Sequence, residues 1–261
     1  MRASMPAIGD AAAMDIRGLT RAFAAVFAIT LLAACSGVAA RQALPVAASA
    51  SMPEDAEAAG LVDVRAFVPD AELDIRYAVT RNFVGTRVEG YDAARCWLHR
   101  PVAEALANVA ADLRPESIKL RIFDCYRPAR AVAHFMRWAK DMDDQRTKPE
   151  FYPSLEKVAL VGEYIAEKSG HSRGATIDLS LMQCDARGEN CRDLDMGTPF
   201  DFFDTRANTD DPRMTPQQRG NRDRLREAMQ RHGFANYPME WWHFTFKPEP
   251  TPHTHFDIPI R

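Results

Sequence analysis

Apolar positions along residues 61–261 recur with two different periods, and these periods predict both strands and helices. Short apolar or alternating runs are typical of strands, whereas apolar residues three to four apart mark one face of a helix. The runs predict strands over 62–68, 72–77, 118–123, 175–181 and 241–246. The wider spacing predicts helices over 101–113, 129–141, 154–167 and 215–232.

The last helix carries the clearest boundary signals. Thr215 is a good N-cap, Pro216 suits the first helical position, and Gly233 ends the segment. Strands and helices do not alternate regularly along the chain, so an α+β fold is favoured over a doubly wound parallel sheet. We expect a single domain with a central antiparallel or mixed sheet flanked by helices.

The N-terminal hydrophobic run predicts an export signal. Arg17 and Arg21 precede an apolar stretch over 22–34, which is shorter than the roughly 20 residues of a bilayer-spanning helix. The alternative is a buried helix. The stretch ends at Leu-Ala-Ala-Cys35, which resembles the bacterial lipobox, and Ser36 is similar to residues that permit sorting to the outer membrane. Lipidation of Cys35 would anchor a periplasmic protein through its acyl chains; ordinary cleavage would leave it soluble in the periplasm.

Composition then divides the chain into three parts. Residues 1–35 are the predicted signal, residues 36–60 are rich in Ala, Ser, Pro and Glu and predict a flexible tether, and residues 61–261 suffice for one folded domain. The formal net charge is −3. A nearly balanced charge does not indicate a nucleic acid or an acidic polymer as partner, and the predicted lipid anchor is the sole membrane contact that we expect.

Four further cysteines remain after Cys35, an even number in a compartment that permits disulfides. Three pairings are possible. Cys184 and Cys191 are seven residues apart, which suits a locally closed loop and would leave Cys96 with Cys125. Reduced, inert thiols are the alternative. A zinc site made only of cysteines needs closely spaced pairs such as Cys-x-x-Cys, and the sequence has none.

Two short motifs carry candidate chemistry. His171 and Asp178 are seven residues apart with Gly174 between them, so the histidine would lie in a loop and the aspartate in the strand that follows. Glu240 and His243 are three apart, and residues three apart on a strand face opposite sides, so Glu240 is expected in the turn before the strand. Two imidazoles and a carboxylate suit catalytic zinc, with a neighbouring Glu to move protons. Each motif is weak alone, since Asp178 could equally cap or pair locally.

The motifs together resemble those of the zinc D-alanyl-D-alanine dipeptidases related to the vancomycin-resistance enzyme. The resemblance covers the whole predicted domain, because further motifs occur in the same order. They are Tyr77 with Asn82-Phe83-x-Gly85 and Gly90-Tyr91, then Asp124-Cys125-Tyr126-Arg127-Pro128, Met196-Gly197-x-x-Phe200-Asp201 and Phe256-Asp257-Ile258-Pro259. The resemblance implies a fold like that of hedgehog and D,D-peptidase domains.

The resemblance also implies roles. His171, Asp178 and His243 match the ligands of one Zn²⁺ per chain, Glu240 matches the general base and acid, and Arg127 matches the residue that stabilises the oxyanion. Three other positions match groups near the termini of a small dipeptide substrate: Ser169, Tyr77 and Asp201. For Asp201, helix capping or a structural hydrogen bond is the alternative.

The sequence departs from the family pattern at three places. Gly170 stands where some relatives carry a second Ser, Cys125 replaces the usual Gly before Tyr126, and the lipobox-like N-terminus differs from cytoplasmic relatives. A periplasmic enzyme would meet D-Ala-D-Ala released during wall turnover, which favours D-alanine salvage over vancomycin resistance. The alternatives are a D,D-carboxypeptidase acting on peptidoglycan stem peptides and a non-catalytic wall-binding lipoprotein. Binding alone would need neither Glu240 nor Arg127.

Overall fold

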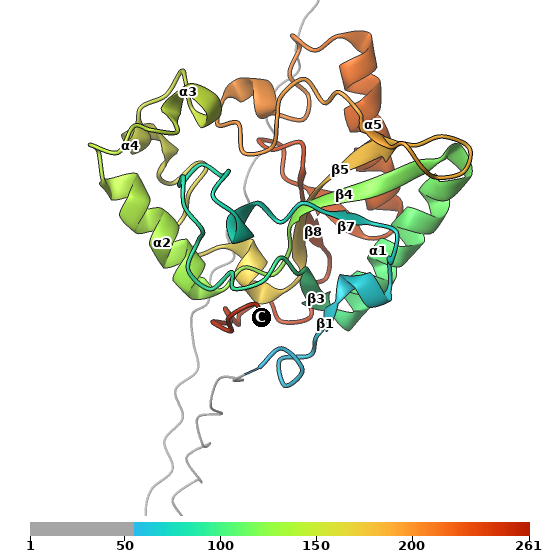
Figure 1. The fold of residues 1–261 in the computed structure, drawn as a ribbon, viewed down its shortest axis with the longest axis horizontal. Coiled ribbons are helices and arrows are strands. Elements are labelled where there is room, and N and C mark those ends of the chain that lie inside the picture. Colours follow the sequence, from blue (N-terminus) through green and yellow to red (C-terminus); the bar gives the residue numbers. More distant parts are fainter. Residues whose placement is uncertain (1–54) are drawn as a thin grey trace, which may run out of the picture. The chain divides into compact units, whose positions relative to one another are not determined.

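The computed structural model describes residues 55–261 (Figure 1). The predicted signal, Cys35 and residues 36–54 of the predicted tether lie outside these residues. Among the helices of 55–261, none combines the length and the apolar character that crossing a bilayer requires.

A mixed sheet forms the centre of the described domain, between α1 and α5 on one side of the view and α2, α3 and α4 on the other (Figure 1). Its strands follow the order β2-β4-β5-β8-β7, and β6 pairs with β5. The bounds are β2 Glu72–Leu73, β4 Ile118–Asp124, β5 Thr176–Gln183, β6 Arg192–Asp193, β7 Phe234–Asn236 and β8 His243–Phe246. Only β2 and β4 run parallel; the other pairs are antiparallel. The predicted α+β fold with a central mixed sheet is therefore confirmed.

A separate two-stranded antiparallel sheet joins β1 (Leu61–Asp63) to β3 (Trp97–His99). The α-helices are α1 Arg100–Leu113, α2 Ala129–Lys140, α3 Lys148–Phe151, α4 Lys157–Leu160 and α5 Pro216–Arg231. Single 3₁₀ turns occupy Val64–Ala66, Arg76–Ala78, Arg114–Glu116, Gly170–Arg173 and Thr205–Ala207.

The longer helices begin and end where their sequence signals predict. Thr215 Oγ1 accepts from the N–H of Gln218, and the Gln218 side chain accepts from the N–H of Thr215, which is a complete capping box. Gly233 follows α5 with φ +86°, a conformation that glycine adopts without strain. Helix α1 packs against α5 and β4 through a buried apolar face.

The predicted helix over 154–167 is wrong. Only α4 is helical there, and a turn closed by a bridge between Val161 and Ile165 follows it. Gly162 interrupts the helix with φ +96°, and Val158 is 68% exposed, so the apolar spacing does not mark a buried face. This turn instead forms one wall of the cavity described below.

Three predicted strands are shorter in the structure. The run over 62–68 gives β1 and then a 3₁₀ turn capped by Asp63, and the run over 72–77 pairs only at β2. The last strand begins at His243 because residues 240–242 form a turn. Apolar side chains in these runs are buried without sheet pairing, which a pattern of hydrophobicity does not distinguish from a strand.

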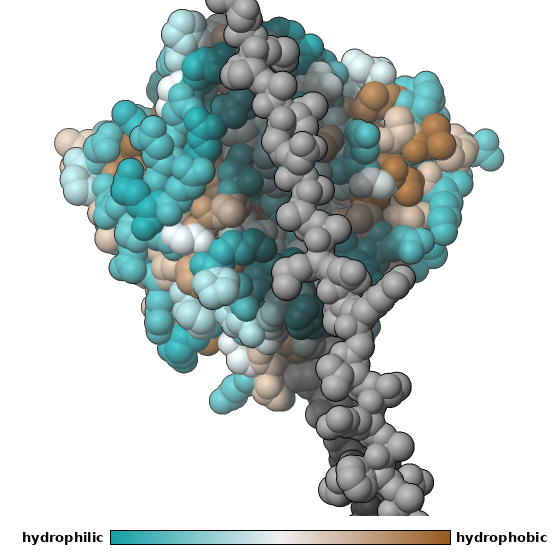
Figure 2. All heavy atoms as spheres, turned by 180° about the vertical axis from the view of Figure 1, so that it is seen from behind, coloured by the Kyte–Doolittle hydropathy of each residue, from teal (hydrophilic) through white to brown (hydrophobic). Residues whose placement is uncertain are grey.

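The core is one continuous cluster of buried side chains, and aromatic rings dominate its centre. Tyr77 contacts Phe83, Tyr91, Phe135 and Phe200 with ring centroids 4.9–6.3 Å apart. On the face seen in Figure 2, hydrophilic side chains predominate, and apolar ones gather towards the edge where α3 and α4 lie.

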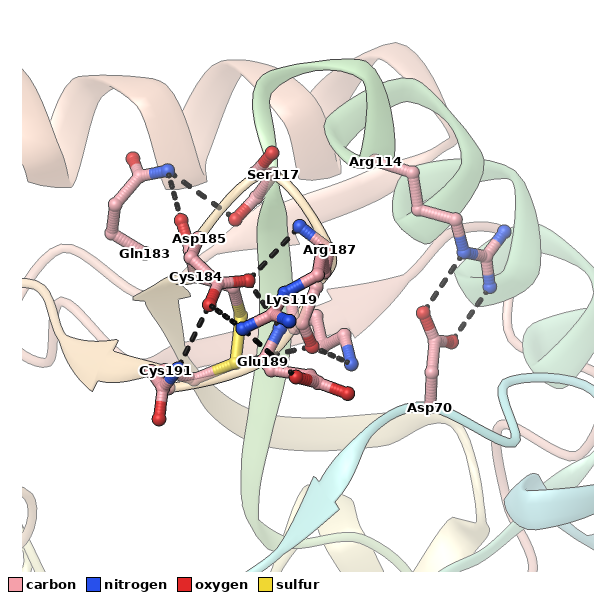
Figure 3. Close-up of a disulfide and its surroundings, with 12 residues drawn as sticks. Asp70, Arg114, Ser117, Lys119, Gln183, Cys184, Asp185, Arg187, Glu189 and Cys191 are labelled. Atoms are coloured by element: carbon pink, nitrogen blue, oxygen red, sulfur yellow. Dashed lines mark hydrogen bonds and ion pairs between the residues drawn. A yellow bond between two sulfur atoms is a disulfide. The ribbon is translucent and has the colours of Figure 1, made fainter.

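Disulfides join Cys96 to Cys125 and Cys184 to Cys191. The second closes the loop between β5 and β6, where Asp185 accepts from the N–H groups of Arg187 and Glu189 (Figure 3). The first joins the residue before β3 to the residue after β4.

Candidate active site

Strand register places three polar side chains next to one another across the sheet. Asp178 on β5 is paired with Asp124 at the end of β4 and with His243 at the start of β8. All three come from adjacent strands, so the sheet itself sets their spacing. Glu240 lies in the turn that precedes β8, as the sequence predicts.

His171 reaches the same point from the 3₁₀ turn Gly170–Arg173. Ser169 caps this turn, with its Oγ accepting from the N–H of His171 at 3.2 Å, and Gly174 ends it with φ +70°. The Nδ1 of His171 lies 2.7 Å from the carbonyl oxygen of Cys125 and donates to it. This contact orients the ring so that Nε2 faces Asp178 and His243.

The side chains of His171, Asp178 and His243 converge as a ligand set. One ligand atom from each lies within 4.8 Å of the other two. His171 Nε2 is 3.3 Å from Asp178 Oδ2 and 3.3 Å from His243 Nδ1, and His243 Nδ1 is 3.0 Å from Asp178 Oδ1. Asp178 Oδ1 is buried, and His243 Nδ1 is the polar atom recorded against it. Facing imidazole nitrogens and a buried carboxylate fit a divalent cation with N and O ligands, as zinc requires.

The charges at this cluster shift the pKa values of two of the three side chains. Burial by itself would raise the pKa of Asp178, but the imidazoles of His171 and His243 lower it below its usual range. Burial by itself would lower the pKa of His243, but its contact with Asp178 raises it. The aspartate therefore stays ionised and available as a ligand.

Glu240 lies beside the ligand set with its side chain 11% exposed. Its Oε2 is 3.5 Å from His243 Nδ1. Burial, with a smaller contribution from the charge of Asp178, raises the pKa of Glu240 to about 7. A carboxyl group with that pKa can both take and give a proton near neutral pH.

Arg127 is held in one position by charge and by aromatic rings. Its Nε donates to Asp124 Oδ2 at 2.9 Å, and its Nη2 forms ion pairs with the same oxygen at 2.9 Å and with Asp178 Oδ2 at 3.7 Å. The guanidinium carbon lies 5.1 Å from the centroid of the Tyr77 ring and 5.0 Å from that of Phe135. Asp124 also accepts from the Tyr91 hydroxyl at 2.6 Å.

Asp201 and Tyr77 form a second polar group in the site. The Tyr77 hydroxyl donates to Asp201 Oδ2 at 3.0 Å. Burial, together with the negative charge of Asp178, raises the pKa of Asp201 well above its usual value. Asp201 also has φ +59°, a conformation that is uncommon outside glycine and is often found at functional sites.

These side chains surround one cavity of about 320 Å³. The cavity is lined by all eight residues that the sequence assigned to catalysis, metal binding or substrate binding: Tyr77, Arg127, Ser169, His171, Asp178, Asp201, Glu240 and His243. The turn over 162–166 and Tyr237 form another wall, and the Tyr237 hydroxyl donates to the carbonyl oxygen of Glu163 at 3.4 Å.

Sequence reasoning assigned no role to several residues of the site. Asp124 stands in a motif that carries the resemblance, yet only strand register reveals that it holds Arg127. Tyr237 and the turn over 162–166 carry no motif. The hydrophobic pattern over 162–166 predicts a helix, so no sequence signal marks this turn or Tyr237 as part of the cavity wall.

Comparison with known proteins agrees with the motifs. The peptidase M15 family described as D-ala-D-ala dipeptidase matches residues 57–261. A D-alanyl-D-alanine dipeptidase of Enterococcus faecium is 37% identical over 189 residues, covering 72% of this chain and 92% of the relative. A D-alanyl-D-alanine dipeptidase of Streptomyces coelicolor is 39% identical over 188 residues, covering 72% and 91%. One from Escherichia coli is 35% identical over 184 residues, covering 70% and 83%.

The predicted resemblance is thus confirmed over the whole described domain, and with these matches and this site the chain belongs to the D-Ala-D-Ala dipeptidase family of M15 peptidases.

Proposed function

We propose that this chain hydrolyses the dipeptide D-Ala-D-Ala to two molecules of D-alanine, with one Zn²⁺ held by His171, Asp178 and His243. The convergence of these three ligand atoms in a small cavity, with Glu240 and Arg127 beside them, carries the proposal. Bound zinc supplies Lewis-acid chemistry, which lowers the pKa of water and polarises a peptide carbonyl.

Glu240 moves the protons of the reaction. Its carboxylate takes a proton from the attacking water and then gives it to the departing amine. The raised pKa of Glu240 allows both steps near neutral pH, since the carboxyl group is neither a very weak base nor a very strong acid there. Its position in the turn before β8 places it 3.5 Å from His243, so the proton is handled close to the metal ligands.

Arg127 stabilises the negative charge that develops on the carbonyl oxygen of the scissile bond. An arginine remains protonated at any pH at which the enzyme works, and a guanidinium that is already fixed in position needs little reorganisation during the reaction. Asp124, Tyr77 and Phe135 fix it from three directions.

Asp201, Tyr77 and Ser169 hold the ends of the dipeptide. Burial and the negative charge of Asp178 raise the pKa of the buried Asp201 carboxyl group, and Arg127 opposes this only in part, so a further positive charge beside it would stabilise the ionised form. The free ammonium group of a dipeptide would supply that charge. Ser169 lies at the cavity wall beside His171, where its hydroxyl is available to the other end of the substrate.

The proposal is tested by measuring amine release from D-Ala-D-Ala with the purified, zinc-loaded chain, in parallel with Glu240→Ala and with a stem pentapeptide as substrate. Glu104→Ala is a matched control because Glu104 is exposed on α1, away from the cavity. We expect dipeptide cleavage that Glu240→Ala abolishes, that Glu104→Ala retains, and that does not extend to the pentapeptide. Cleavage of the pentapeptide alone would indicate a D,D-carboxypeptidase, and zinc binding without cleavage of either would indicate a wall-binding protein.

We further propose that the enzyme is periplasmic, anchored to the outer membrane through lipidated Cys35, and that it serves cell-wall turnover or D-alanine salvage. The Leu-Ala-Ala-Cys35 tetrad after a short apolar run supports the anchor. Cys35→Ser should move the protein from the membrane fraction to the soluble periplasmic fraction. Equal membrane association of both forms would contradict the anchor.

A further inference from the structure

The segment 125–127, directly after β4, lies between the metal ligand His171 and the small sheet β1-β3. On one side, the Cys125 carbonyl accepts from His171 Nδ1 at 2.7 Å, and the N–H of Arg127 donates to the His171 carbonyl at 3.3 Å. On the other side, the N–H of Tyr126 donates to the Trp97 carbonyl at 2.9 Å. One short segment thus contacts both the ring and the backbone of a predicted zinc ligand.

A covalent bond ties this segment to the start of β3. Cys125 is bonded to Cys96, and the two residues are 1% and 0% exposed. Three residues after Cys96, the N–H of His99 donates to the carbonyl of Gly174 at 2.9 Å, and the N–H of Gly174 donates to the His171 carbonyl at 3.0 Å. The contacts form a closed ring that leads from Cys125 through Cys96, His99 and Gly174 to His171 and back to Cys125.

We infer that the Cys96–Cys125 disulfide is a positioning element of the zinc site, which holds the Cys125 carbonyl where it orients His171. This inference rests on the proposed zinc site. A hydrogen bond to the second ring nitrogen of a histidine ligand fixes its tautomer and its direction, and losing such a partner typically costs about 10-fold to 100-fold in metal affinity or activity. The disulfide is the covalent link in the ring, so without it the carbonyl is held by hydrogen bonds alone.

The other disulfide is an internal control. Cys184 and Cys191 close the loop 185–190, which is held by Asp185 and by a bond from Lys119 Nζ to the Gly188 carbonyl at 2.7 Å (Figure 3). No residue of this loop lines the cavity of the site. Its removal should therefore lower stability without changing the affinity for zinc.

The first experiment compares Cys96→Ala/Cys125→Ala with Cys184→Ala/Cys191→Ala and with the unaltered chain. Zinc affinity is measured by competition with a chromophoric chelator, and circular dichroism verifies folding. We expect the first variant to bind zinc at least tenfold more weakly, and the second to bind within twofold of the unaltered chain. Two folded variants with equal zinc affinity would overturn the inference. Failure of the unaltered chain to bind zinc would instead overturn the proposed function.

A second experiment needs no variant and remains decisive if the first variant does not fold. The unaltered chain is exposed to a water-soluble phosphine with and without Zn²⁺, and alkylation with mass spectrometry follows each disulfide separately. The phosphine attacks one sulfur and breaks the S–S bond, which releases the first thiol; water then hydrolyses the phosphorus–sulfur bond, so that the phosphine becomes its oxide and the second thiol is released. Coupling between two sites is reciprocal, so zinc should protect the bond that positions its ligand. We expect zinc to slow reduction of Cys96–Cys125 at least tenfold and that of Cys184–Cys191 less than twofold. Equal protection of both bonds, or of neither, would refute the positioning role.

Discussion

Replacing Asp124 with Asn tests whether the charge beneath Arg127 holds the site together. Asp124 is fully buried, and the Arg127 side chain is only 13% exposed. Burial raises the pKa of Asp124 while Arg127 opposes that effect, so each charge depends on the other to remain in the interior. Asp124→Asn keeps the shape of the side chain and one acceptor but removes the negative charge.

The expected cost follows from the geometry of the pair. At 2.9 Å, two unit charges attract by about 6 kcal/mol with an effective dielectric constant of about 20. The asparagine oxygen can still accept from the guanidinium, and a hydrogen bond to a charged group contributes about 1.5–3 kcal/mol. The free energy of unfolding should therefore fall by about 3 kcal/mol, at the lower end of the range of about 3–5 kcal/mol for breaking a buried pair. For a domain of this size the Tm should fall by about 6–12 °C.

Urea unfolding measures the loss of stability, and the kinetics of D-Ala-D-Ala cleavage measure the effect on activity. Asp70→Asn is the matched control, because Asp70 binds Arg114 through two hydrogen bonds of 2.8 and 3.0 Å at the surface (Figure 3). Breaking an exposed pair of this kind should lower the free energy of unfolding by about 1 kcal/mol or less. We expect kcat/KM to fall at least tenfold for Asp124→Asn only, since Arg127 loses its fixed position. If Asp124→Asn and Asp70→Asn lose the same stability and both retain full activity, the reasoning is refuted.

Three other outcomes are expected. In the metal-free protein, burial raises the folded-state pKa of Glu240 to about 7 from 4.5, so its contribution to stability is complete below pH 4.5 and is lost as the pH rises through 7. In the unaltered chain, Glu240 should therefore make the free energy of unfolding about 3 kcal/mol larger at pH 4.5 than at pH 8, and Glu240→Gln should remove this difference in urea titrations at the two pH values. The same dependence of stability on pH in Glu240→Gln would contradict the prediction. Chelation of zinc should lower the Tm and abolish cleavage, with both restored by Zn²⁺, because a ligand that binds only the folded state stabilises it; activity that survives chelation would exclude a metal role for His171, Asp178 and His243. Thr215→Ala should destabilise the domain by about 1 kcal/mol through loss of the N-cap of α5, whereas equal stability by thermal unfolding would show that the capping box contributes nothing.

The sequence alone determined the class of fold, the family and the chemical character of the site. The motifs identify the family because several of them occur in the same order along the chain and contain the residues of the candidate site. Amphipathic spacing and boundary residues predict α1, α2 and α5 because these helices bury one continuous face, and their signals are local. Strands β4 and β5 are equally clear because they are almost entirely buried.

Only the tertiary structure decided how the motifs meet. Asp124, Asp178 and His243 are far apart in the chain, and they become neighbours through antiparallel register, which local patterns do not contain. The segment over 154–167 has helical spacing, but Gly162 and exposed Val158 show that spacing alone does not determine burial. The ring of contacts from Cys96 to His171 depends on three separate segments, 96–99, 125–127 and 171–174. Such contacts are set by packing over the whole domain. The sequence therefore predicts the candidate ligands, but only the tertiary structure shows which residues hold them in position.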